Sequence, residues 1–62
     1  MTTQDIAAQL ATAGITATAT PGGVDLADGT RITPLGGTWG LVLGHVVLGQ
    51  GTVAEIVDAL TA

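Results

Sequence analysis

The chain of 62 residues contains no cysteine and no serine. The absence of cysteine excludes disulfide bonds, thiolate zinc sites and cysteine nucleophiles together. Threonine is the remaining hydroxyl nucleophile, and no feature of the sequence indicates that one is activated. The lone His45 forms a metal site only if several carboxylates converge on it. We therefore expect no metal, no cofactor and no enzymatic activity.

Positive charge is almost missing as well. Arg31 is the one basic residue, against five acidic residues and a formal net charge of −4. Nucleic-acid binding requires several cations that neutralise phosphates, so we expect no nucleic-acid partner.

No long apolar segment is present. The longest apolar run, residues 39–48, has about half the roughly 20 residues that a membrane-spanning helix needs. The N-terminus also lacks a basic region followed by an apolar one. We expect no membrane partner and a soluble protein, located in the cytoplasm or in a virion.

Lys, Asn, Phe and Tyr are missing too. Their codons are AT-rich, so their absence indicates a gene from a GC-rich genome, such as that of an actinobacterium or one of its phages. This observation concerns the source of the gene and not its chemistry.

The length limits the chain to a single small domain, residues 1–62. A chain of this size buries only about 60% of its unfolded surface, so its core is marginal. Disulfides and thiolate metal sites are excluded, and 47% of the residues are hydrophobic. A homo-oligomer is the remaining way to bury more surface.

Two segments have the periodicity of amphipathic helices. In the first, Thr2 or Thr3 begins the helix, Asp5 lies in its first turn, and Gly14 ends it in a Schellman motif. In the second, residues 52–60, apolar residues recur at helical spacing. Thr52 and Glu55 have the spacing of a capping box at its start.

The segments between the helices have strand patterns. Residues 15–20, ITATAT, alternate strictly and predict a half-buried strand that could be an exposed edge. A hairpin follows around Asp28 and Gly29. A loop of three residues with a left-handed Gly29 places Val24 opposite Ile32 and pairs Asp25 with Arg31, and we prefer it to a two-residue loop.

Residues 38–48, TWGLVLGHVVL, permit several structures. They form one long strand, two strands that turn near Gly44 and His45, or a short helix with a stripe of glycines. The valines and glycines favour strand. A strand that is apolar on both faces lies centrally, or is covered by a helix on one side and a second subunit on the other. The interface candidates on one face of this segment are Trp39, Leu41, Leu43 and His45.

Two residues in this segment have an open alternative. Trp39, the one aromatic residue, anchors the core beneath the second helix or serves at an interface. The apolar surroundings of His45 favour a neutral histidine in the core or at an interface over a catalytic one.

The segment from Gly49 to Ala54 matches the G-x-G-x-x-G/A spacing of a dinucleotide-binding loop. That unit needs a second parallel strand with an acidic residue about 20 positions on, and the sequence given ends at Ala62. We therefore favour a tight turn from strand to helix. The alternative is a ligand site at Gly49, Gly51 and Thr52, where helix N–H groups attract anions.

These patterns predict an α+β fold with an N-terminal helix, an antiparallel meander of three or four strands and a C-terminal helix packed on the sheet. The function we expect is that of a non-enzymatic interaction or assembly protein, for instance a small phage component, acting as a homo-oligomer. The alternative is a protein that binds or sequesters a nucleotide or another small ligand, with an intersubunit pocket near His45.

Overall fold

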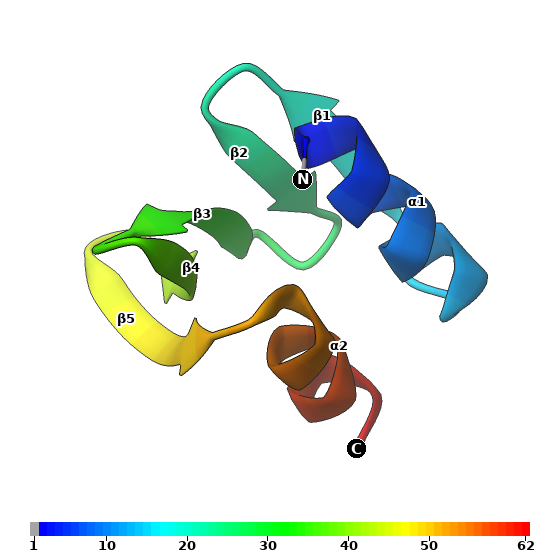
Figure 1. Ribbon diagram of the computed structural model, residues 1–62. Coiled ribbons are helices and arrows are strands. Elements are labelled where there is room, and N and C mark those ends of the chain that lie inside the picture. Colours follow the sequence, from blue (N-terminus) through cyan, green and yellow to red (C-terminus); the bar gives the residue numbers. More distant parts are fainter. Residues whose placement is uncertain (1) are drawn as a thin grey trace.

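The computed structural model describes residues 2–62 and shows a five-stranded antiparallel sheet, with one helix before it and one helix after it in the chain (Figure 1). The elements in chain order are α1 (Thr3–Thr12), β1 (Ala17–Thr20), β2 (Gly23–Leu26), β3 (Arg31–Leu35), β4 (Thr38–Leu43), β5 (Val46–Gly51) and α2 (Val53–Thr61). The strands pair in chain order as a meander, so β1 and β5 are its edges. The predicted α+β class is confirmed, whereas the prediction of three or four strands is wrong.

The difference in strand number arises in the apolar segment and the glycines after it. The chain reverses at Gly44, which has a left-handed φ of +61°, and at His45. Two strands therefore form from the apolar run, as one of the alternatives for residues 38–48 predicted. The glycine segment then continues β5, with Gly49 opposite Leu41 and Gly51 opposite Trp39. The tight turn that we expected at Gly49 and Gly51 is therefore absent from this segment, which continues as extended strand to Gly51. Helix α2 follows directly after Thr52.

The first helix begins and ends as the sequence predicts. The Thr2 hydroxyl accepts a hydrogen bond from the Asp5 N–H at 3.1 Å, and the Asp5 carboxylate accepts one from the Thr2 N–H at 3.0 Å. At the other end Gly14 has a φ of +84°, and the Ile15 N–H donates to the Leu10 carbonyl at 2.8 Å. This is the Schellman pattern.

Within residues 2–62, no helix has the length and hydropathy of a membrane span.

The β2–β3 hairpin has the predicted register. Asp25 lies opposite Arg31, and the Leu26 N–H donates to the Thr30 carbonyl across a loop of three residues. Gly29 takes the left-handed conformation there, with a φ of +93°. The preferred three-residue loop is therefore confirmed.

Both helices pack on the sheet and contact each other, α1 beside β1 and β2, and α2 beside β4 and β5 (Figure 1). Their apolar faces meet residues of the three central strands in one core. The buried hydrophobic residues are Ile6, Leu10, Val24, Leu26, Ile32, Leu41, Val53 and Ile56. The sheet thus has one face covered by helices, and its last hairpin leads from the core to an open edge.

Candidate interaction surface

Large apolar side chains face the solvent at the end of the β4–β5 hairpin. The exposed fractions are 48% for Leu43, 59% for Val46, 51% for Val47 and 54% for Leu48. We call these four residues the apolar tip. In the rest of the described chain, residues 2–62, the leucine, isoleucine and valine side chains are buried or half-buried. Contiguous exposed apolar patches often mark binding sites, so the tip is the first candidate surface.

The tip is exposed because the core ends before the hairpin does. Leu41 and Leu43 are two residues apart on β4 and share a face of the strand. The exposed fraction rises from 8% at Leu41 to 48% at Leu43. Helix α2 packs on β4 and β5 through Val53 and Ile56, which lie in the core with Leu41. The turn end of the hairpin therefore extends beyond the cover that the helix provides, whereas Leu48 lies beside α2 and lines a hollow with Leu41 and Ile56.

Three of the four tip residues belong to β5, an edge strand with a β-bulge. Leu41 pairs with Gly49, but Val42 pairs with Val47, so Leu48 is an additional residue on β5. An edge strand directs alternate backbone N–H and C=O groups away from the sheet. A bulge twists such an edge and interrupts regular pairing. The edge of β5 is thus open, but it is not a flat and regular template.

The tip is also free of formal charge. Between Arg31 and Glu55 the only ionisable side chain is that of His45. Arg31, opposite Val42 on β3, is engaged by Asp25, with 2.6 Å between Nε and Oδ1. The hydrogen bond from the Arg31 guanidinium lowers the pKa of Asp25, and the same contact raises the pKa of Arg31. The predicted cross-strand pair is confirmed, and the one cation of the chain is already paired.

The structure places the four predicted interface residues in different environments. Leu43 is exposed in the tip, and His45 is exposed in the turn beside it. A position of His45 in the core is therefore wrong, because the apolar run reverses at that residue. Leu41 is buried in the core. Trp39 is half-buried and packs against the core, as one of its two alternatives predicted.

Three residues of the tip were missed as interface candidates from the sequence. A single alternating strand through residues 38–48 places Val46 and Leu48 on the face opposite Leu43, and Val47, on the same face as Leu43, is not among the candidates. The reversal at Gly44 and His45 sets Val46 opposite Leu43 and Val47 opposite Val42, so the exposed residues lie at one end of the hairpin but on both of its faces. The feature of the sequence that indicates the reversal is the pair Gly44-His45 between two apolar runs.

The glycine segment has a different local chemistry from a phosphate-binding loop. The Thr52 N–H donates to the Glu55 carboxylate at 3.0 Å, and the Glu55 N–H donates to the Thr52 hydroxyl at 3.2 Å. This confirms the capping box, and the backbone hydrogen bond from Thr52 lowers the pKa of Glu55. The Gly51 carbonyl accepts from the Thr38 hydroxyl at 2.6 Å. A carboxylate thus already accepts from the Thr52 N–H, while ligand binding at Gly49, Gly51 and Thr52 stays a prediction.

A shallow concavity lies beside the start of α2. It has a volume of about 450 Å³, and Trp39, Thr52, Val53 and Ala54 contribute to its lining. The side chains named here offer an indole and a hydroxyl but no basic group. This hollow is near the predicted ligand segment, yet it brings no cation to it.

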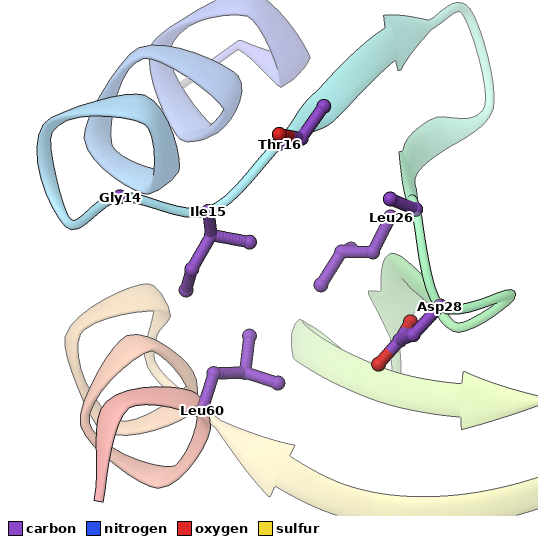
Figure 2. Close-up of a pocket in the computed structure, with 7 residues that line it drawn as sticks. Gly14, Ile15, Thr16, Leu26, Asp28 and Leu60 are labelled. Atoms are coloured by element: carbon purple, nitrogen blue, oxygen red, sulfur yellow. The ribbon is translucent and has the colours of Figure 1, made fainter.

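A second cavity, of about 310 Å³, lies where the two helices end (Figure 2). Ile15, Leu26 and Leu60 point toward one another from three separate segments, and Asp28 lies at the edge of the cavity. The Asp28 carboxylate accepts hydrogen bonds from the Thr30 N–H at 2.9 Å and from the Thr30 hydroxyl at 2.6 Å. These bonds, the side-chain one first, lower the pKa of Asp28. No basic side chain lines the cavity, so it lacks an acid–base pair.

Metal binding finds no support in the described part of the chain either. Within residues 2–62, no three side chains of His, Cys, Asp or Glu are grouped so that they could hold a metal ion. Four carboxylates already have hydrogen-bond partners in helix caps, in a turn or in an ion pair. They are those of Asp5, Asp25, Asp28 and Glu55. The apolar tip remains the surface with the clearest chemical character.

The chain was compared with known proteins at three levels. No protein-family model, no curated protein and no solved structure matches it. The function is therefore inferred from the chemistry of its own surface.

Proposed function

We propose that the protein is a non-enzymatic interaction or assembly protein that acts as a homo-oligomer through the apolar tip. The observation that carries this proposal is the exposure of about half of each side chain in the tip, on an uncharged edge hairpin. Removing apolar surface from water contributes about 25 cal/mol per Å². A role as a small phage component agrees with the residue usage of a GC-rich genome.

The character of the surface favours binding over catalysis. Valine and leucine side chains bind by desolvation and transfer no protons. The acidic residues near cavities are already hydrogen-bonded within their own turn or cap, as Asp28 and Glu55 illustrate. The apolar tip is therefore suited to bind another apolar surface.

The proposal is tested with two variants that add the same charge at different places. Val47→Glu places a carboxylate in the tip, and Gln4→Glu places one on the exposed first turn of α1, where the helix dipole favours it. We expect the wild type and Gln4→Glu to share one oligomeric mass in size-exclusion chromatography with light scattering at about 100 µM. Val47→Glu is expected to elute as a monomer with an unchanged circular dichroism spectrum.

Two outcomes of this experiment would contradict the proposal. If Val47→Glu is folded and keeps the wild-type oligomeric mass, association does not use the tip. If the wild type itself is a monomer at this concentration, the homo-oligomer is excluded under the conditions tested.

A further inference from the structure

The open edges of the sheet permit two kinds of contact between copies. Strand β5 can lie against β5 of a second copy, or against β1 of the next copy. The first contact is isologous and closes as a dimer, whereas the second is head-to-tail and continues as a ring or a filament. We propose that a second copy of this chain docks β5 against β5 across a two-fold axis, tip to tip; this rests on the proposed function.

The charge distribution favours contact between identical surfaces. Near a two-fold axis each residue approaches its own copy, so any charged residue there meets a like charge. Strand β5 has no charged residue, although the chain carries a formal net charge of −4. The neighbouring Arg31 and Asp25 neutralise each other. Glu55 of α2 lines a hollow together with Leu48, so each copy brings one carboxylate to the margin of the contact, whereas the residues of β5 bring none.

The side chains of the two edges favour the same arrangement. Strand β1 consists of alanine and threonine, and none of its residues is an exposed large hydrophobic residue. Pairing β5 with β1 sets Val46, Val47 and Leu48 against small and polar side chains. Pairing β5 with its own copy sets apolar residues against apolar residues and removes more apolar area from water.

The size of the tip is suited to a small, reversible dimer. Four side chains with about half of their surface exposed present roughly 400 Å² in total, divided between the two faces of the hairpin end. A standard interface takes about 800 Å² from each partner, so the backbone of β5 and the half-buried Val42 must contribute as well. The bulge at Leu48 limits backbone pairing to short stretches on either side of it. The contact therefore depends on side-chain packing more than on a continuous ladder.

Single cysteine variants test this geometry, because the chain has no cysteine of its own. Val46→Cys, Val47→Cys and Leu48→Cys each place one thiol in the tip, and Thr18→Cys places one on the exposed side of β1 as the control. Each variant is oxidised with copper phenanthroline at about 100 µM, and circular dichroism checks its fold. A disulfide forms only where two Cα atoms approach within about 7 Å.

The expected result is rapid disulfide-linked dimer formation by at least one of the three tip variants. We expect this tip variant to form its disulfide-linked dimer at least ten times faster than Thr18→Cys does. In a mixture of Thr18→Cys with any tip variant, we expect the disulfide between the two different chains to form at least ten times more slowly as well. Preferential formation of the mixed product overturns the two-fold arrangement and indicates head-to-tail contact. An oligomeric wild type without accelerated disulfide formation in any tip variant also overturns this arrangement alone. A monomeric wild type at the same concentration overturns the proposed function with it.

Discussion

At the residue scale, the close approach of the paired strands β2 and β3 depends on a single glycine. A Cβ atom at Gly23 would lie 2.5 Å from the carbonyl oxygen of Ile32, a contact with backbone that no side-chain rotation relieves. At the preceding Gly22, a Cβ atom would meet nothing within 4 Å. Two adjacent glycines of the same turn therefore have different roles, and only Gly23 is required by packing.

This difference predicts unequal effects of the same substitution. Gly23→Ala is expected to lower the free energy of unfolding by about 1–3 kcal/mol, because the added methyl group overpacks the sheet. Gly22→Ala is expected to change it by about 0.5 kcal/mol or less. Urea denaturation followed by circular dichroism measures both values. Equal stability of the two variants would contradict the close approach of the strands.

At the element scale, both helices begin with a capping box that uses a carboxylate. The pKa of Asp5 is lowered first by the backbone hydrogen bond from Thr2, and that of Glu55 by the one from Thr52. A carboxylate whose pKa is lower in the folded state stabilises the fold above its unfolded pKa. That contribution is lost as the pH falls toward the folded value. Acid is therefore expected to weaken both helix starts.

The second capping box allows a direct test of this pH dependence. Glu55→Gln retains a side-chain oxygen that accepts from the Thr52 N–H, but it does not titrate. Between pH 7 and pH 3, we expect the urea midpoint of the wild type to fall more than that of Glu55→Gln. The ordinary pKa of 4.5 lies inside this window. A fall of the same size in both proteins would show that Glu55 contributes nothing to acid sensitivity.

Features set by neighbouring residues could be predicted from the sequence. The caps at Thr2 and Thr52 and the pairing of Asp25 with Arg31 each depend on a spacing of a few positions and on local hydrogen bonds. The fate of the apolar run could not be predicted in the same way. Alternation assigns side chains to two faces of a strand, but it does not show where a strand reverses or how far a helix covers it.

The candidate surface illustrates the same limit. Leu41 and Leu43 have equivalent places in the alternation, and both are interface candidates from the sequence. The structure buries Leu41 and exposes Leu43 because the core ends between them. The position of that boundary follows from the packing of α2 on the sheet, which depends on contacts between distant parts of the chain.

At the scale of the whole molecule, the chain is compact without a partner but leaves one hairpin end uncovered. Its radius of gyration is 10.1 Å, close to the roughly 10.6 Å expected for a folded chain of this length. Association is therefore expected to cover surface and not to complete the fold. Substitutions in the apolar tip should accordingly change the oligomeric mass before they change the secondary structure.

The mass of the wild-type protein in solution tests the central claim most directly. Sedimentation equilibrium over concentrations from about 1 µM to about 1 mM is the measurement. We predict a mass that rises with concentration from 6.0 kDa for one chain toward twice that value, as the apolar tips of two copies meet. A mass of 6.0 kDa at every concentration would contradict self-association through the tip.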